Sequence, residues 1–417
     1  MDYYQALQYI KSLSGRGIVP GLGNIEKLLC ELSNPEKKLN IIHVAGTNGK
    51  GSFGAYLSSV ITASKKHCGR FVSPCVGEYE NTFLIDGICV PKTVICDCTQ
   101  TLKSAMERLE EKNIFPTSFE AETALAFLIF SELAPDYVII ECGMGGKNDA
   151  TNVIEKPVLS VITKISLDHM AFLGNTLTEI ATEKAGIIKM GAPVVSALQD
   201  AEVMSVIKSV CTNSNSRLYA ANSPTLTEIE YEKTVFELYD KKYTTHMIGT
   251  YQPENASLAI TAAKVLGIDN NAIKNGIESA RWAYRFERIG KFILDGAHNP
   301  DAASALAKSL EIYTNPENTA FICACFKDKD YKKIAEITAP YAKEVYCITA
   351  PTSRGLDKDI LCDTFKLYGA DAKTADTLEE AIEKAYSYKH IIIFGTLSIL
   401  DEAKQITERL NDNATLQ

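Results

Sequence analysis

The sequence lacks an excess of basic residues and lacks any long apolar run. Its 417 residues include 43 lysines and arginines against 52 aspartates and glutamates, which gives a formal net charge of −9. An acidic chain has no general electrostatic footprint for nucleic acid or for an acidic membrane surface. No apolar segment approaches the length that a membrane-spanning helix needs. We therefore expect neither a nucleic acid nor a membrane as partner.

The sequence also lacks a secretory signal and a disulfide or zinc pattern. Residues 1–5 include neither a basic region nor an apolar core. Twelve cysteines are present, but no two of them are spaced C-x-x-C. The C-x-C pairs Cys96/Cys98 and Cys323/Cys325 are not followed by histidine at zinc spacing. We expect reduced, buried thiols and a cytoplasmic location.

Short apolar segments alternate with segments of helical periodicity, which predicts an α/β fold. We expect a P-loop-type, mostly parallel, doubly wound sheet, with strands that include residues 70–72, 137–141 and 158–163. A hairpin around Asp86-Gly87 is expected at residues 82–90, because two-residue turns favour an Asp-Gly pair. A small antiparallel β insert is expected at 226–230, 234–239 and 243–248. A second, smaller Rossmann-like α/β domain is expected to contain strands at 292–295, 320–324, 344–348 and 391–394. The predicted domains are residues 1–284 and 285–417.

Residues 41–52 are predicted to form a strand, a phosphate-binding turn and the start of a helix. The turn has glycines at 46, 49 and 51, which permit positive φ angles and let backbone N–H groups approach an anion. Lys50 would contact the β- and γ-phosphates, and Ser52 would bind Mg²⁺. The motif departs from the usual P-loop because Ala45 replaces its first glycine and Gly51 is inserted after Lys50. The alternative is a glycine-rich turn with a solvated lysine.

Three further residues of the first half are candidates. Glu141 ends an apolar strand, where a carboxylate is well placed for Mg²⁺, although a capping or solvated acid is equally consistent. His169 follows the next strand; because Mg²⁺ prefers oxygen ligands, its residue type favours a hydrogen-bonding or general-base role, or a structural histidine. Lys184 lies on a predicted helix that begins near Thr178, and spacing alone indicates a solvated lysine.

The second half offers a polar turn before a helix that begins at Pro300. Asp295 and His298 at this turn predict a contact with ribose, adenine or phosphate, and a turn with a helix N-cap is the alternative. Arg285 precedes them and carries a guanidinium group suited to phosphate, unless it belongs to a charged linker.

These blocks together resemble the folylpolyglutamate synthase and dihydrofolate synthase family of the Mur ligase superfamily. The resemblance covers most of the chain, in family order. The matching blocks are residues 43–52, Glu141 with 143–152, 162–169 with 173–174 and 183–187, and 295–300.

The resemblance implies an ATP-dependent amide ligase with two Mg²⁺ ions. Its substrates would be ATP, L-glutamate and the carboxylate of dihydropteroate or a reduced folate, and its intermediate would be an acyl phosphate. We expect a monomer. Two other functions stay open: a peptidoglycan-precursor ligase of the same superfamily, and a nucleotide-binding switch without catalysis.

The resemblance also implies roles for individual residues. Lys50, His169 and Lys184 would be catalytic, with Lys184 carbamylated. One Mg²⁺ would bind Ser52 and Glu141, and the second would bind near Ser73 and His169. Lys329 and Thr396 would contact glutamate or the acceptor. The residues that would bind ATP are Thr47, Asn48, Gly49, Lys50, Gly51, Ser52, Asn255, Arg285, Asp295 and His298.

The chain departs from the family pattern in several places, and two of them bear on the choice of substrate. The segment after Ser73 reads Ser-Pro-Cys-Val, with Glu78, Asn81 and Thr82 in the later positions, where the family often has Ser-Pro-His-Leu followed by arginine and Glu-Arg. Tyr251 stands where the family usually has histidine. These departures leave the choice of acceptor open.

Overall fold

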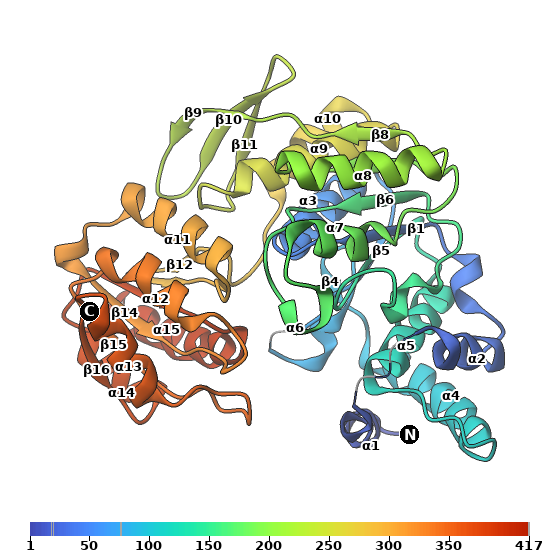
Figure 1. Cartoon of the computed structure of the whole chain (residues 1–417), viewed down its shortest axis with the longest axis horizontal. Coiled ribbons are helices and arrows are strands. Elements are labelled where there is room, and N and C mark those ends of the chain that lie inside the picture. The colour runs from blue at the N-terminus through green and yellow to red at the C-terminus, as the bar shows by residue number, and fades with distance from the viewer. Residues whose placement is uncertain (18, 20, 76, 416–417) are drawn as a thin grey trace. The chain divides into compact units, whose positions relative to one another are not determined.

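The computed structural model describes residues 1–17, 19, 21–75 and 77–415. The chain divides into two compact units (Figure 1), which are described separately. Unit 1 comprises Met1–Thr225, Glu237–Tyr243 and Glu254–Ala280, and unit 2 comprises Leu226–Phe236, Thr244–Pro253 and Arg281–Gln417. The domain boundary expected between residues 284 and 285 remains a prediction.

Unit 1 is built on an eight-stranded sheet in the order β4-β3-β2-β5-β1-β6-β7-β8. The six strands from β2 to β8 in that order run parallel. β3 and β4 extend the sheet as an antiparallel hairpin. The predicted mostly parallel sheet is therefore confirmed. Its strands are β1 (Ile41–Ala45), β2 (Cys68–Phe71), β3 (Phe83–Ile85), β4 (Ile88–Cys89), β5 (Tyr137–Glu141), β6 (Leu159–Ile162), β7 (Val194–Ser196) and β8 (Leu218–Ala220).

Helices cover both faces of this sheet. On β2, an added Cβ at Gly69 would meet Phe130 of α5, whereas the next side chain, Arg70, lies against Gly54 of α3. Adjacent residues of a strand point to opposite faces, so α5 and α3 lie on opposite sides of the sheet. The helices of unit 1 are α1 (Tyr3–Ser12), α2 (Gly23–Glu31), α3 (Lys50–Ala63), α4 (Lys92–Glu110), α5 (Ser118–Leu133), α6 (Met170–Leu173), α7 (Leu177–Ala185), α8 (Ala201–Asn213), α9 (Gln252–Val265) and α10 (Asn270–Ser279).

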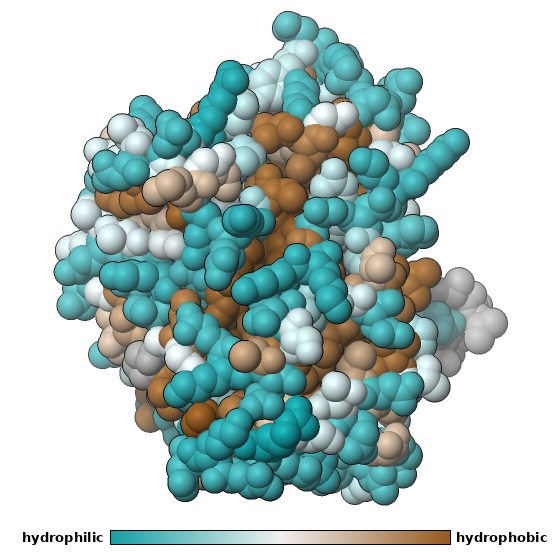
Figure 2. Space-filling model, turned by 90° about the vertical axis from the view of Figure 1, so that its right-hand side faces the viewer, coloured by the Kyte–Doolittle hydropathy of each residue, from teal (hydrophilic) through white to brown (hydrophobic). Residues whose placement is uncertain are grey.

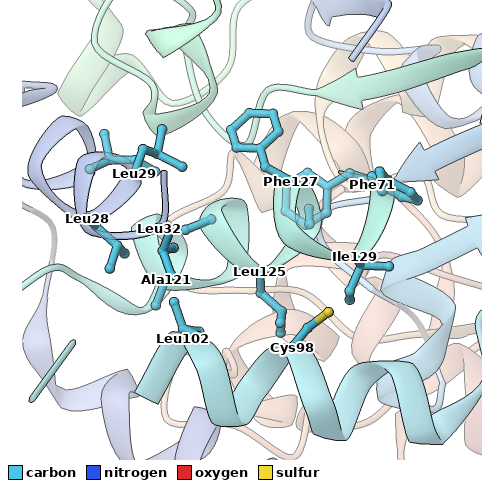
Figure 3. Packing of buried hydrophobic residues seen from close by; sticks show 14 of the residues in the cluster. Leu28, Leu29, Leu32, Phe71, Cys98, Leu102, Ala121, Leu125, Phe127 and Ile129 are labelled. Carbon is cyan, nitrogen blue, oxygen red and sulfur yellow. The ribbon is translucent and has the colours of Figure 1, made fainter. Parts of the chain in front are cut away.

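The largest part of the core on the α5 side is formed by α2, α4 and α5. Figure 3 shows Leu28, Leu102 and Leu125 from these three helices directed toward one another. α5 is apolar on nearly every side because it is buried between the sheet and the other helices. Its start is fixed by a capping box in which Thr117 accepts from the Glu120 N–H group and Glu120 accepts from the Thr117 N–H group.

A three-stranded sheet forms the predicted β insert, in the order β11-β10-β9. Its strands are β9 (Thr225–Ile229), β10 (Thr234–Leu238) and β11 (Lys241–Thr245). Tyr239 and Asp240 join β10 to β11 with φ angles of 52° and 57°. Positive φ at both central residues is the requirement of a type I′ hairpin turn. The predicted hairpin at Asp86-Gly87 has the same property, with φ angles of 53° and 82°.

Unit 2 contains a six-stranded sheet in the order β12-β13-β17-β14-β15-β16. β12 pairs antiparallel with β13, and the other neighbours are parallel, as expected for a Rossmann-like domain. The strands are β12 (Glu287–Ile289), β13 (Phe292–Leu294), β14 (Thr319–Cys323), β15 (Glu344–Cys347), β16 (Asp371–Thr374) and β17 (His390–Phe394). The helices are α11 (Pro300–Tyr313), α12 (Tyr331–Thr338), α13 (Lys358–Leu367), α14 (Leu378–Ala385) and α15 (Leu400–Thr415).

Surface and thiol properties agree with the sequence. Hydrophilic side chains cover most of the face in Figure 2, and hydrophobic ones gather in the recesses between them. No helix in the described part of the chain is both long and apolar enough to cross a membrane. The twelve cysteines are free thiols, and the predicted burial of Cys96, Cys98, Cys323 and Cys325 is confirmed.

Candidate active site

The predicted phosphate-binding turn lies between β1 and α3. α3 begins at Lys50, so Lys50, Gly51 and Ser52 form its first turn, whose N–H groups have no acceptor within a helix. The N–H groups of Thr47 and Asn48 donate instead to the Lys164 carbonyl oxygen, at 2.9 and 3.2 Å. A helix N-terminus with this geometry favours an anion.

One expectation about this turn is wrong. Gly46 and Gly49 have positive φ angles of 156° and 88°, but Gly51 does not. Gly51 lies inside α3, where its backbone is helical. The extra Gly51 after Lys50 is therefore a helical residue of α3 and not a left-handed residue of the loop.

Two lysines converge on one carbonyl group of the turn. The Gly46 carbonyl oxygen accepts from Lys50 Nζ at 3.0 Å and from Lys184 Nζ at 2.8 Å. Lys184 is only 4% exposed. Burial, together with the neighbouring Lys50 ammonium group, lowers the pKa of Lys184 from 10.5 to about 7. The site thus holds one cation at the phosphate turn and, near neutral pH, a substantial fraction of neutral amine.

Lys184 reaches this position because α7 packs closely against the turn that follows β5. The Lys147 N–H group donates to the Glu183 carbonyl oxygen at 2.8 Å. A Cβ added at Gly146 would come within 2.8 Å of backbone atoms of Glu183 and Lys184. The spacing-based interpretation of Lys184 as a solvated lysine is wrong, because its surroundings are created by this packing and not by its own helix.

Glu141 is buried at the end of β5 and is paired with Arg70 of β2. Arg70 Nη2 lies 3.4 Å from Glu141 Oε1 and donates to the Gly51 carbonyl oxygen at 3.0 Å. Arg70 is opposite Ile139 in the parallel register, so Arg70 and Glu141 point to the face covered by α3. Burial lowers the pKa of Arg70, and the adjacent Glu141 opposes this shift. Glu141 is therefore neither a solvated nor a capping acid.

The residues predicted for the first Mg²⁺ have suitable chemistry. The Ser52 hydroxyl group and the Glu141 carboxylate supply oxygen atoms from two buried side chains, and Mg²⁺ prefers a few such oxygens together with water and substrate phosphates. Arg70 links the first turn of α3 to the end of β5, because its Nη2 atom contacts both the Gly51 carbonyl oxygen and the Glu141 carboxylate. Among the described residues, no group of three or more His, Cys, Asp or Glu is arranged to hold a metal.

The second predicted metal site is less well defined. His169 follows β6, has a left-handed φ of 51°, and is the N-cap residue of α6. Its Nε2 atom lies 3.9 Å from Asp168 Oδ2. Ser73 follows β2, so both residues come after strands that end at the same edge of the sheet. Ser73 is half-buried, and its role as a ligand remains a prediction.

The segment after Ser73, which departs from the family pattern, is held by the buried carboxylate of Glu80. Glu80 lies in the short 3₁₀ helix Tyr79–Thr82 and accepts from Lys92 Nζ at 2.9 Å. Thr82 is also buried. Val76 lies outside the described residues.

Asn255 of α9, which is predicted to bind ATP, lies against the phosphate turn although it is distant in sequence. A Cβ added at Gly49 would lie 2.4 Å from Asn255 Oδ1. Both the left-handed φ and this close approach require glycine at position 49.

We expect Gly49→Ala to lower the free energy of unfolding by roughly 1–3 kcal/mol, the usual cost of a left-handed non-glycine residue, and to weaken ATP binding. Denaturant unfolding and calorimetric titration with ATP would measure both effects. Gly23→Ala is the matched control, because Gly23 begins α2 with no atom within 4 Å of an added Cβ. Wild-type stability and ATP affinity in Gly49→Ala would contradict the assignment.

In unit 2, Asp295 organises the polar turn after β13. Its Oδ2 atom accepts from the Tyr251 hydroxyl and from the Phe286 N–H group, both at 2.8 Å, and its Oδ1 atom accepts from the Ala297 N–H group at 2.8 Å. Burial raises the pKa of Asp295. Asp295 therefore fixes the backbone around the predicted nucleotide contacts, and Tyr251 is part of this network.

The other predicted residues of unit 2 lie at the same edge: Arg285 precedes β12, whose start pairs with the end of β13, and the rest follow strand ends. Arg285 Nη1 donates to the Tyr284 carbonyl oxygen at 3.0 Å, and His298 Nδ1 donates to the Gly296 carbonyl oxygen at 2.7 Å. Lys329 lies in the loop after β14, and the buried Thr396 follows β17, where its hydroxyl accepts from the Ser398 N–H group at 3.3 Å. β17 lies between β13 and β14, so these loops are neighbours.

Sequence reasoning missed two residues of unit 1. Arg70 was included only in a predicted strand, and an arginine in an apolar strand was the available signal. Asp149 was noted only within a glycine-rich block, yet its carboxylate accepts from the Met144 N–H group at 2.8 Å and from the Thr151 hydroxyl at 2.6 Å. Thr151 also contacts His43 Nε2 at 2.8 Å. This network shapes the turn after β5.

Comparisons with known proteins agree with this geometry. Residues 44–263 match the Mur ligase middle domain, and residues 284–397 match the Mur ligase glutamate ligase domain. A dihydrofolate synthase/folylpolyglutamate synthase of Bacillus subtilis is 33% identical over 97% of this chain and 98% of its own length. This chain belongs to the folylpolyglutamate synthase and dihydrofolate synthase family of the Mur ligases.

Two further members of the family support the fold and its extent. Folylpolyglutamate synthase of Lacticaseibacillus casei is 32% identical over 85% of this chain and 87% of its own length. The crystal structure of folylpolyglutamate synthase from Mycobacterium tuberculosis, complexed with ADP and AMPPCP, has a TM-score of 0.89. It is 27% identical and covers 97% of this chain and 99% of its own. The predicted α/β fold of this family is thereby confirmed.

Proposed function

We propose that this chain is an ATP-dependent ligase that joins L-glutamate to dihydropteroate, to the glutamate tail of reduced folates, or to both. The observation that carries the proposal is the convergence of Lys50 and Lys184 on the phosphate turn. It occurs in a chain that resembles dihydrofolate and folylpolyglutamate synthases over nearly its whole length.

The chemistry follows from the poor reactivity of a carboxylate as an acyl donor. The acceptor carboxylate attacks the γ-phosphorus of ATP, the bond to the β-phosphate oxygen breaks, and ADP leaves. The glutamate amine then attacks the acyl phosphate, forms the amide, loses a proton and releases phosphate. Lys50 and the first turn of α3 would hold the phosphates and offset their negative charge.

Mg²⁺ would be held by Ser52 and Glu141, with a second ion near Ser73 and His169. When bound, it would neutralise charge on the transferring phosphoryl group. Arg70 would position Glu141, because its Nη2 atom contacts both the Glu141 carboxylate and the Gly51 carbonyl oxygen in the first turn of α3.

The surroundings of Lys184 support its carbamylation, because they favour the neutral amine. Only a neutral amine adds to CO₂: the nitrogen forms a bond to carbon, the π electrons of one C=O bond move to oxygen to give a carboxylate, and the nitrogen releases a proton. The lowered pKa of Lys184 provides that neutral amine near pH 7. The resulting carbamate would attract the Lys50 ammonium group that the protonated amine repels.

The deciding test is an assay of the purified chain with ATP, Mg²⁺ and L-glutamate. Separate reactions contain dihydropteroate, tetrahydrofolate or a nucleotide-linked muramyl acceptor, and one reaction contains no acceptor. We expect ADP release that requires both glutamate and a folate-type acceptor, with a product heavier by one glutamyl residue. Turnover on the muramyl acceptor alone would favour the peptidoglycan ligase. ATP binding without turnover on any acceptor would favour the non-catalytic switch.

Cytoplasmic location and the monomeric state are also part of the proposal. Free cysteine thiols, most of them buried, support the first. Light scattering of the purified chain would measure the second.

A further inference from the structure

Unit 2 contains a groove of about 700 Å³ that adjoins the polar turn after β13, because its lining residue Phe286 donates its N–H group to Asp295. Its lining comes from residues 231–232 and 246–248, from the segment 281–290 and from Lys404 of α15. Of the predicted site residues, Arg285 alone lines it. The volume lies within the range of small-molecule sites, roughly 300–1,000 Å³.

The groove has an apolar floor with aromatic side chains beside it. Ile248 and Phe286 are buried residues of the floor. Tyr231 is held firmly, because its hydroxyl donates to the Tyr313 carbonyl oxygen at 3.0 Å and the Arg288 guanidinium lies 4.7 Å from its ring centre. Trp282, the single tryptophan of the chain, also lines the groove. This surface suits a planar ring.

Cationic side chains predominate among the charged lining residues. Lys404 Nζ lies 2.6 Å from Glu287 Oε1, so these two charges offset each other. The lining as a whole has four cationic side chains and two carboxylates. Arginine binds carboxylate and phosphate groups through two parallel hydrogen bonds, which suits an anionic ligand. The charged lining residues are Arg281, Arg285, Arg288, Lys404, Glu232 and Glu287.

We infer that this groove is a second ligand site for a planar heteroaromatic anion. Its ring packs on Trp282 and Tyr231, and its carboxylate or phosphate groups pair with Arg281 and Arg288. A nucleoside phosphate and a pteridine with a glutamate tail share this chemistry; the pteridine source rests on the proposed function.

Trp282 gives a direct measurement, because its emission is the only tryptophan signal of the chain. The intact protein is titrated with ADP and, separately, with pteroyltriglutamate, with correction for absorbance. Pyrophosphate and triglutamate are the matched ligands without a ring. We expect a saturable change in emission with one ring-bearing anion, at least tenfold tighter than with its ring-free counterpart. Whichever ring-bearing anion gives the change identifies the source.

Charge variants locate the bound ligand. Arg281→Gln and Arg288→Gln should each weaken the response about tenfold, since each removes one charged contact. Lys308→Gln, which alters an exposed lysine of α11 outside the groove, should bind as the wild type does. Lys50→Gln should retain the response, because it alters only the phosphate turn.

Three results would overturn the inference: no saturable change with either ring-bearing anion, unchanged affinity in both arginine variants, or loss of the response in Lys50→Gln. Circular dichroism verifies that each variant is folded. Arg281 is exposed, so Arg281→Gln keeps the test valid if Arg288→Gln does not fold. Failure of the ligase proposal would appear in the ADP-release assay and would leave this titration unaffected.

Discussion

Lys184→Ala is expected to reduce glutamate-dependent ADP release by roughly 10²–10³-fold, the range seen when one group that stabilises transition-state charge is removed. The residue lies 2.8 Å from the same carbonyl oxygen that Lys50 contacts, so the carbamate would act beside the transferring phosphoryl group. Steady-state assays with saturating ATP, acceptor and glutamate measure the loss. Added acetate should restore part of the activity, because it supplies a short carboxylate in the space that the side chain vacates.

The control is Lys208→Ala, which removes an exposed lysine of α8 and should leave activity unchanged. The activity of the wild-type enzyme should also fall as pH decreases below about 7, because the protonated amine of Lys184 cannot add CO₂. Full activity in Lys184→Ala, or no effect of CO₂ removal on the wild type, would refute the carbamate.

The lowered pKa of Lys184 also affects stability. Between about pH 7 and pH 10.5 the unfolded chain binds a proton at this residue that the folded chain does not bind, so this group makes the free energy of unfolding rise with pH. Below about pH 7 the folded and the unfolded chain both bind this proton, and the full free-energy cost of burying the charged amine is present. Lys184→Ala should therefore flatten the increase that denaturant unfolding measures between pH 7 and pH 9.

Local patterns predicted the elements whose geometry is set within a few residues. The strand and turn at residues 41–52 place glycines and a lysine where the backbone needs them, and the structure shows β1, the turn and α3. The hairpin at Asp86-Gly87 and the start of α11 at Pro300 are confirmed for the same reason: their φ angles follow from the residue type.

The site itself could not be assembled from such patterns. Whether Lys184 is solvated depends on the close contact of Gly146 with α7, and the role of Arg70 depends on the parallel pairing of β2 with β5. These contacts join segments far apart in sequence, and no periodicity records them. The family resemblance pointed to Lys184 because it carries information about such contacts, but it did not point to Arg70.

Arg70→Met is expected to lower the free energy of unfolding by roughly 3–5 kcal/mol, which is the usual cost of breaking a buried ion pair by removing one partner. The methionine side chain replaces the aliphatic part of arginine but leaves the Glu141 carboxylate buried without the Arg70 guanidinium. It also removes the donor to the Gly51 carbonyl oxygen in the first turn of α3. Denaturant unfolding followed by circular dichroism measures the change.

Two further variants separate the buried pair from a general loss of charge. Arg108→Met breaks the solvent-accessible pair between Arg108 and Glu31 and should cost about 1 kcal/mol or less. Arg70→Met combined with Glu141→Gln should recover part of the lost stability, because a neutral amide is less costly to bury than an unpaired carboxylate. ADP release should stay low, because the proposed Mg²⁺ ligand is gone. If Arg70→Met is as stable as Arg108→Met, Arg70 does not hold Glu141 in place, and the carboxylate must be positioned by other contacts of the site.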